Sequence, residues 1–77
     1  MTKINQLESL RVFKAVVEAG SFSAAAKHLN ISAARVSKSI EHLETELETT
    51  LFHRSTRQMQ ITDTGERCYQ RALVLLG

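Results

Sequence analysis

The stretch LNISAARVSKSI, residues 29–40, contains the signals that decide the fold. Asn30 tolerates the left-handed backbone conformation that ends a helix, and Ile31 can fold back as the hydrophobic contact after such an end. Ser32 can then cap the next helix, because its hydroxyl accepts a hydrogen bond from a free amide of the first turn. Two helices are therefore predicted to meet across a very tight turn.

Helical periodicity precedes this turn. Apolar residues recur at three- and four-residue steps up to residue 19, Asn5 and Glu8 form the pattern of a capping box, and Gly20 suits a left-handed helix end. Ser23 is predicted to cap a second helix, short and rich in alanine, over residues 24–29. Such a helix can pack closely against its neighbours.

A third helix is expected over residues 33–48. At 100° per residue, four apolar side chains fall within a narrow arc that is expected to face the core: Val36, Ile40, Leu43 and Leu47. The opposite side is expected to face outward and carries Ala34, Lys38, Glu41, His42 and Thr45.

The hydrophobic period changes after this helix. Residues 58–62 alternate polar and apolar, which is typical of a half-buried strand, and residues 51–53 are its plausible partner. The segment between them would form an exposed hairpin tip that carries Arg54 and Arg57. Thr62 is expected to cap a fourth helix, because carboxylates follow in the first turn, near the positive end of the helix dipole.

Length and composition indicate one small domain. The chain has 77 residues, of which 43% are hydrophobic and 23% charged, with no long apolar run and no hydrophobic core of signal-peptide length at the N-terminus. We therefore expect a cytoplasmic protein that does not interact with membranes. Cys68 is the single cysteine, and the three histidines match no metal-binding spacing, so neither a metal nor a cofactor is expected in this domain.

The charge distribution says more than the net charge of +2. From Lys27 to Lys38 there are three basic residues and no acid, whereas four glutamates crowd into residues 41–48. A three-helix core followed by a two-stranded wing can present one helix to the DNA major groove, which is about 12 Å wide. Since acidic residues repel phosphate, the N-terminal half of the third helix is expected to face the DNA.

Each candidate residue has a predicted role at such an interface with DNA. Ser37 and Lys38 can reach base edges, and an alanine can lie against a thymine methyl group. The residues predicted to read bases are Ala33, Ala34, Arg35, Ser37 and Lys38. The residues predicted to contact phosphates, or to act from the wing at a flanking minor groove, are Ser23, Ser32, Arg54, Thr56 and Arg57. For the two serines, capping is the expected main role, with phosphate contact in addition.

The segments GSFSAAAKHLNIS, VSKSIEHLETEL and LFHRSTRQMQITDTGE resemble the N-terminal DNA-binding domain of LysR-type transcriptional regulators, in order and across nearly the whole chain. The resemblance implies a mostly α, winged helix-turn-helix fold with a three-helix core, a two-stranded β wing and a C-terminal linker helix. It also implies a DNA-binding domain at residues 1–62, the start of a dimerisation helix at residues 63–77, and a bacterial regulator whose small effector binds a C-terminal domain absent from this chain.

Three residues depart from the family pattern at the start of the predicted recognition helix. Members commonly have Gln-Pro where this chain has Ala33 and Ala34, and often Ala where it has Arg35. In the family that glutamine can contact a base or a phosphate; this chain has no glutamine at that position, and Arg35 is a candidate to replace part of the contact. A further departure is Glu48-Thr49, where a glycine often appears before the wing.

The last helix indicates self-association. Tyr69, Ala72 and Leu76 share a stripe, with Leu73 beside it, that this small domain is expected to leave uncovered. The sequence therefore predicts a homodimer through this helix and, for a full-length protein, a tetramer as a further option.

Two other classes of function predict different sequence features. A protein-interaction winged helix would present an apolar outward face on the third helix, and an enzyme fragment would need a convergent acid, base or nucleophile group, which the sequence does not offer. The sequence therefore predicts a domain that binds double-stranded DNA sequence-specifically and has no catalytic activity of its own.

Overall fold

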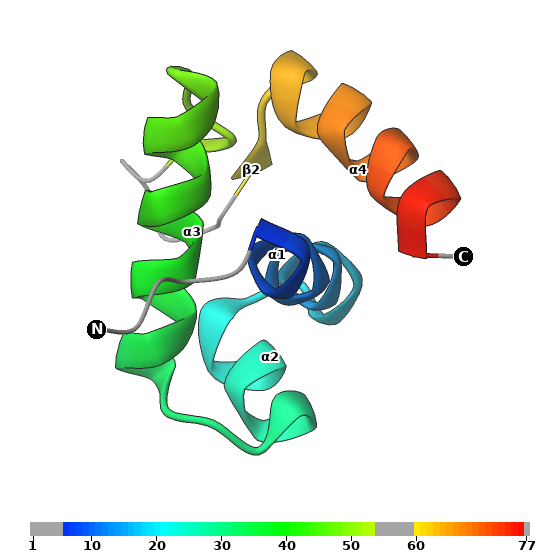
Figure 1. Cartoon of the computed structure of the whole chain (residues 1–77). Helices are drawn as coiled ribbons and strands as arrows, with labels where there is room; N and C mark the ends of the chain where they lie inside the picture. Colours follow the sequence, from blue (N-terminus) through cyan, green and yellow to red (C-terminus); the bar gives the residue numbers. More distant parts are fainter. Residues whose placement is uncertain (1–5, 54–59, 77) are drawn as a thin grey trace.

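The computed structural model describes residues 6–53 and 60–76, which form four helices and a two-stranded sheet (Figure 1). The helices are α1 (Gln6–Ala19), α2 (Phe22–Leu29), α3 (Ala33–Leu47) and α4 (Asp63–Leu76). The strands β1 (Phe52–His53) and β2 (Gln60–Ile61) pair antiparallel, with Phe52 opposite Ile61 and His53 opposite Gln60. This architecture confirms the predicted winged helix-turn-helix fold.

The apolar core lies where α1, α2 and α3 meet, and α1 runs between α3 and α4 (Figure 1). Three phenylalanine rings link separate elements in this core. The ring of Phe52 in β1 lies 5.5 Å from that of Phe13 in α1 and 5.9 Å from that of Phe22 in α2, measured between centroids. Tilted and edge-on ring pairs of this kind add about 0.5–1.5 kcal/mol each beyond area burial. The base of the wing is thereby fixed to the helices.

Helix α2 begins two residues earlier than the sequence predicted. Ser21, in extended conformation, is the cap, and its Oγ accepts a hydrogen bond of 3.0 Å from the amide of Ala24. The prediction that Ser23 caps this helix is wrong. Starting the helix at Phe22 places Phe22, Ala25 and Ala26 at positions i, i+3 and i+4 on one face, and all three pack in or against the core.

The tight turn between α2 and α3 is confirmed. Asn30 has φ 59°, in the left-handed region, and the amide of Ile31 donates a 3.0 Å hydrogen bond to the carbonyl oxygen of Ala26. Ile31 packs against the core, as expected for the residue that follows such a helix end. Ser32 caps α3, because its Oγ accepts a 3.1 Å hydrogen bond from the amide of Arg35. Gly20, at φ 84°, also adopts its predicted left-handed conformation after α1.

Helix α3 buries most of the arc that the sequence predicted. Val36, Ile40 and Leu43 are almost completely buried, but Leu47 is 41% exposed, so its assignment to the core is wrong. Leu47 is the last residue of α3, and the chain turns away immediately at Glu48, which has φ 53°. Leu47 thus lies beyond the part of α3 that is buried in the core.

Helix α4 begins at the base of the wing. The prediction that Thr62 caps it is confirmed by a 2.9 Å hydrogen bond from the amide of Gly65 to Thr62 Oγ1. Thr62 Oγ1 also donates a 2.7 Å hydrogen bond to the carbonyl oxygen of Thr50. Gly65 is buried, and a Cβ atom there would collide with the carbonyl oxygen of Leu51 and the side chain of Ile61. The absence of a side chain at residue 65 thus lets α4 approach the wing closely.

Candidate nucleic-acid interface

The N-terminal half of α3 presents most of the predicted base-reading residues on the surface. Ala33, Ala34, Arg35 and Lys38 are exposed, whereas Ser37 is half-buried. Positions 34 and 38 are one helical turn apart, so their side chains share one face of α3. Four of the five predicted residues are therefore accessible to a partner, and Ser37 lies at the margin of that face.

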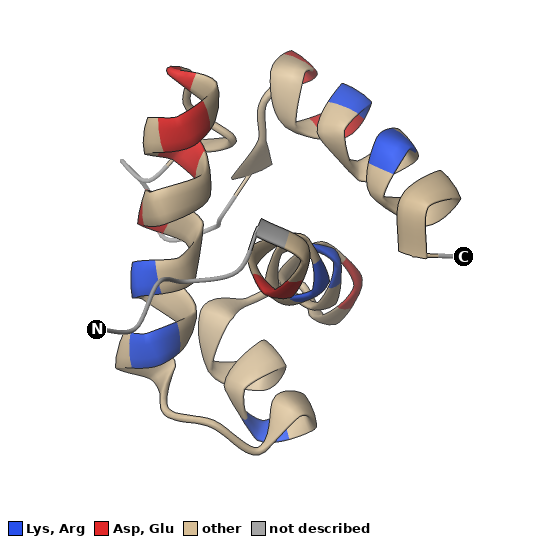
Figure 2. Ribbon diagram, viewed as in Figure 1, with Lys and Arg blue, Asp and Glu red and all other residues tan. Residues whose placement is uncertain are grey.

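Charge is divided between the two ends of α3, as Figure 2 shows. Its basic residues lie at the end joined to α2, and its acidic residues lie at the end that leads to the wing. The first turn of α3 contains no acid. The free amides of that turn carry partial positive charge, which favours an anionic partner. The predicted separation of basic from acidic residues therefore lies along the length of α3.

The two serines predicted to contact phosphates occupy different environments. Ser32 is exposed, but its Oγ already caps α3 by accepting from the amide of Arg35. Ser23 lies in the first turn of α2 and is exposed, and the cap of α2 is made by Ser21 instead. Ser23 thus has an exposed hydroxyl that the α2 cap does not use, while Ser32 caps its helix, which was its predicted main role.

Arg35 forms an ion pair with Glu8 of α1 that the sequence did not reveal. Its Nη2 atom lies 2.8 Å from Glu8 Oε2, and the two side chains remain 60% and 43% exposed. The two residues are 27 positions apart, so no local pattern connects them. Opposite charge was the only sequence signal for this ion pair, and many other pairs of residues share it. The packing of α1 against α3 is what brings these two side chains together.

The tip of the predicted wing falls outside the described residues. Arg54, Thr56 and Arg57, the residues assigned there, lie in the gap between residues 53 and 60. The base of the wing is held by α3, since Glu44 Oε2 accepts a 2.8 Å hydrogen bond from the amide of Leu51. Directly after β2, the amide of Thr62 donates a 2.9 Å hydrogen bond to the carbonyl oxygen of Leu51. The wing thus starts from a fixed position beside α3.

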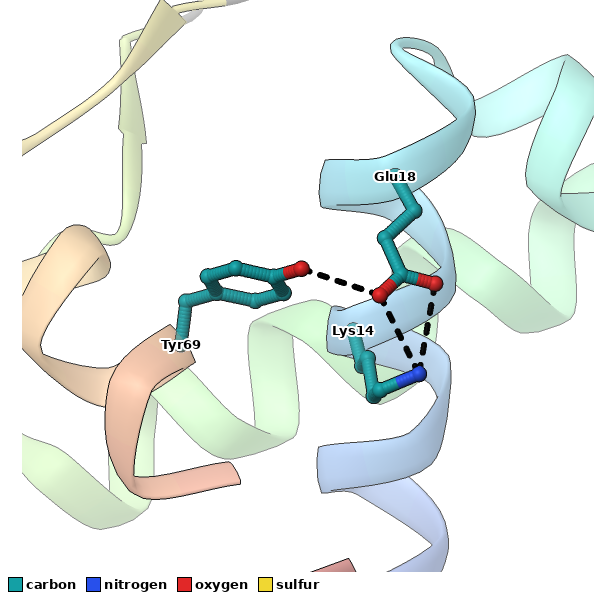
Figure 3. Close-up of polar contacts among 3 residues, drawn as sticks. All are labelled: Lys14, Glu18 and Tyr69. Atoms are coloured by element: carbon teal, nitrogen blue, oxygen red, sulfur yellow. Dashed lines mark hydrogen bonds and ion pairs between the residues drawn. The ribbon is translucent and has the colours of Figure 1, made fainter. Parts of the chain in front are cut away.

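Helix α4 is attached to α1 by a polar contact that Figure 3 shows. The hydroxyl of Tyr69 donates a 2.9 Å hydrogen bond to Glu18 Oε2, and Lys14 Nζ lies 3.1 Å from the same carboxylate oxygen. Hydrogen bonds from Lys14 and then from Tyr69 lower the pKa of Glu18 below its ordinary value. The hydrogen bond to Glu18 raises the pKa of Tyr69, because it favours the neutral phenol.

The predicted dimerisation stripe on α4 is partly covered within the domain. Ala72 is completely buried, and Tyr69 packs against the core, so the expectation that the domain leaves these two residues uncovered is wrong. The reason is that α4 lies against α1, which local periodicity does not reveal. Exposed apolar side chains on α4 instead gather near its C-terminal end: Leu73 at 36%, Val74 at 81% and Leu75 at 63% exposure. Leu76 is half-buried.

Cys68 is half-buried on α4, and burial raises the pKa of its thiol. In residues 6–53 and 60–76, no His, Cys, Asp and Glu side chains gather in a group of three that could hold a metal ion. Within the same ranges, no helix has both the length and the apolar character needed to cross a membrane. In this part of the chain, the exposed basic end of α3 is the candidate functional site.

A three-helix core with a paired wing and an exposed third helix defines a winged helix-turn-helix protein. Residues 7–66 match the family described as bacterial regulatory helix-turn-helix proteins of the lysR family. The chain therefore belongs to the LysR family of bacterial transcription regulators, and the resemblance found in the sequence is confirmed.

Curated relatives include two regulators of Escherichia coli (strain K12). The chain is 46% identical to the HTH-type transcriptional activator TtdR over 69 residues. These aligned residues are 90% of this chain and 22% of TtdR. It is 43% identical to the HTH-type transcriptional regulator DmlR over 76 residues, and this alignment covers 99% of this chain and 25% of DmlR. The chain thus spans a quarter or less of the length of these relatives.

Solved structures of two DNA complexes share the fold. The BenM DNA-binding domain in complex with catB site 1 DNA is 43% identical and superposes with a TM-score of 0.87, covering 91% of this chain and 75% of that one. The CbnR DNA-binding domain in complex with DNA is 34% identical and superposes with a TM-score of 0.86, covering 91% and 80%. The described helices and wing therefore have the arrangement found in DNA-binding domains of this family.

Proposed function

We propose that this chain binds double-stranded DNA sequence-specifically, with the N-terminal half of α3 in the major groove and the wing, residues 53–58, at a flanking minor groove. The observation that carries the proposal is the exposed, acid-free N-terminal half of α3, with Lys38 and Ala34 on one face and the glutamates confined to the other half. The DNA complexes of BenM and CbnR support it, since both share this fold.

The candidate residues of α3, of the turns and helix before it, and of the wing have different proposed roles in recognition. Lys38 and Ser37 contact base edges, and Ala33 and Ala34 make apolar contact with thymine methyl groups. Ser32 and Ser23 lie beside phosphates, which positions the domain without reading sequence. Arg54, Thr56 and Arg57 contact the backbone or the minor groove from the wing, where narrow A·T-rich tracts attract guanidinium groups.

The test is a binding-site selection from randomised duplexes with wild-type protein and single variants. Ser37→Ala and Ala33→Gln are expected to change the preferred sequence, because each altered base contact shifts discrimination by about 1–3 kcal/mol. Arg54→Ala is expected to weaken binding to most sequences alike, because a phosphate contact carries no sequence information. Thr45→Ala is the matched control, since it removes a hydroxyl from the exposed side of the other half of α3.

If the selection recovers the same motif with Ser37→Ala and with wild type, then Ser37 is not one of the residues that read bases. The salt dependence of affinity provides a second measurement. Each phosphate contact steepens the log-log slope by about 0.9 for duplex DNA, so binding that is insensitive to salt would contradict the proposal and favour a protein-interaction domain.

We further propose that the chain forms a homodimer through α4. The apolar side chains Leu73, Val74 and Leu75 are exposed at its C-terminal end, and Leu76 lies next to them. A groove beside this patch is lined by residues of α1, α2 and α4, which include Ala15, Ala19, Leu29, Leu73 and Leu76. Exposed apolar patches of this kind commonly mark protein interfaces.

Sedimentation equilibrium tests the dimer. Leu75→Glu places a charge in the patch and is expected to shift the chain toward monomer, whereas Gln70→Glu adds the same charge at an exposed position of α4 outside the patch. A wild-type chain that remains strictly monomeric at high concentration would contradict dimerisation through this segment.

The remaining assignments concern a whole protein of this family. The relatives are transcription regulators, and we propose the same role here, in the bacterial cytoplasm, without catalysis. Response to a small effector, and assembly beyond a dimer, would depend on sequence outside these 77 residues. Chromatin immunoprecipitation of the full-length protein would test the regulatory role, since binding at no promoter region would contradict it.

A further inference from the structure

The ion pair between α1 and α3 lies at the end of α3 that is proposed to read DNA. Arg35 is the third residue of α3, and its Nη2 atom lies 2.8 Å from Glu8 Oε2 near the start of α1. Arg35 projects from the same first turn as Ala33 and Ala34, the predicted base contacts. An acid from another element therefore lies beside a helix end that has no acid of its own.

The guanidinium of Arg35 can bind only a limited number of anionic partners at once. Its planar fork of donors matches a carboxylate and a phosphate with the same geometry. Both members of the pair are substantially exposed, at 60% and 43% of their side-chain areas. Water and ions reach such a pair, so another anion can replace the carboxylate without opening the core.

We propose that Glu8 is a positioning residue of the DNA interface: it holds Arg35 against α1 in the free domain, and a DNA phosphate displaces it when the domain binds. This inference rests on the DNA-binding function proposed above. Its consequence is that Glu8 weakens DNA binding, because the phosphate must compete for Arg35 and the released carboxylate then lies close to the phosphate backbone.

The experiment measures the affinity of the 77-residue chain for a mixed-sequence duplex of about 20 base pairs by fluorescence anisotropy, between about 50 and 200 mM KCl. A mixed sequence suits this purpose, since non-specific binding reports phosphate contacts without any knowledge of the operator. The proteins are wild type, Glu8→Gln, Arg35→Ala and the double variant. Thermal unfolding of each confirms that it is folded.

Glu8→Gln is expected to bind about three- to fivefold more tightly at the lowest salt, because Arg35 is then free to contact a phosphate. Its log-log salt slope is expected to steepen by less than the value of about 0.9 for one whole phosphate contact, because Arg35 contacts a phosphate in both proteins and only the cation uptake by the released Glu8 carboxylate is lost. In the Arg35→Ala background the same substitution should bring a clearly smaller gain, because only the loss of a repulsive charge remains.

The matched control is Glu18→Gln, which removes the same charge from the same helix. Glu18 lies ten residues after Glu8, about 15 Å further along α1, and is also paired with a basic residue, Lys14. If net charge alone mattered, Glu18→Gln would reproduce the gain of Glu8→Gln. The proposal expects Glu18→Gln to gain much less.

Three results would overturn the inference: unchanged or weaker binding by Glu8→Gln, an equal gain in the Arg35→Ala background, or an equal gain from Glu18→Gln. These differ from failure of the proposed function. If the wild type binds no duplex, or if its affinity for the duplex does not depend on salt, then the proposed DNA-binding function is wrong. If wild type binds in a salt-dependent way and Glu8→Gln has no effect, then only the role of Glu8 is wrong.

Discussion

The turns before and after α3 have the same hydrogen-bond pattern but are stabilised by different means. Before α3, the amide of Asn30 donates to the carbonyl of Lys27 at 3.2 Å, and the amide of Ile31 to that of Ala26 at 3.0 Å. After α3, the amide of Glu48 donates to the carbonyl of Thr45 at 3.2 Å, and that of Thr49 to Glu44 at 3.1 Å. Each helix therefore ends in a Schellman motif.

The residues that occupy these motifs differ. The first turn has Asn30 in the left-handed position, which asparagine tolerates, and Ile31 as the hydrophobic contact to the core. The second has Glu48 in the left-handed position and the polar Thr49 where Ile31 stands in the first. The first turn thus carries its own local signals, whereas the second combines left-handed strain with no apolar contact at that residue.

Tertiary contacts compensate in the second turn. The side chain of Glu44 accepts from the amide of Leu51, Thr62 donates to the carbonyls of Leu51 and Thr50, and Leu51 itself is completely buried. A helix end can therefore be specified by its own sequence or by the elements that pack on it. The turn that sets the proposed reading end of α3 is of the first kind.

The largest expected effect comes from removing the buried anchor of the second turn. Leu51→Ala should lower the free energy of unfolding by about 2–5 kcal/mol, since the side chain is fully buried and its loss leaves a cavity. Ile31→Ala should cost less, because Ile31 is only half-buried. Urea unfolding measures both, and an equal cost would contradict the distinction between the two turns.

The next effect concerns the hydrogen bond from the amide of Leu51. Glu44→Ala should destabilise the domain by about 1–3 kcal/mol, because it leaves that part-buried amide without its acceptor. Glu44→Gln is the matched control, since the amide oxygen of glutamine can still accept, and it should cost clearly less. Chemical denaturation of the two variants tests this, and equal losses would show that the charge of Glu44 matters more than the acceptor.

Glu48→Gly is expected to stabilise the domain by up to about 1 kcal/mol. Relief of the left-handed strain, which costs about 1–2 kcal/mol for residues with a Cβ, outweighs the greater freedom of glycine in the unfolded chain. Glu48→Gln separates this effect from removal of a negative charge at the helix C-terminus. A Tm that rises equally in both variants would attribute the gain to charge rather than to conformation.

The smallest effect is expected for Asn30→Gly. Asparagine already adopts the left-handed conformation at little cost, so the unfolding free energy should change by less than about 0.5 kcal/mol. The Tm difference between this variant and Glu48→Gly is the sharpest measure of the contrast between the turns. A stabilisation of Asn30→Gly as large as that of Glu48→Gly would mean that Asn30 is equally strained.

Local signals predicted much of the fold. The left-handed ends at Gly20 and Asn30 and the caps at Ser32 and Thr62 are confirmed, because each involves residues within a few positions of one another. The paired strands were predicted from alternation, although their described parts are only two residues each. The predicted cap at Ser23 is wrong, because Ser21 offers the same hydroxyl two residues earlier and the packing of Phe22 against Phe52 places the start of the helix at Phe22.

For the candidate site, residue order at a fixed helical period was enough to predict the helix that presents it and the separation of charge along that helix. Which of its side chains remain available depends on how the helices pack. Packing of α4 on α1 covers Ala72 and joins Tyr69 to Glu18, and packing of α1 on α3 joins Glu8 to Arg35. Residues distant in sequence meet only when helices pack, and no periodicity within one helix specifies its neighbour.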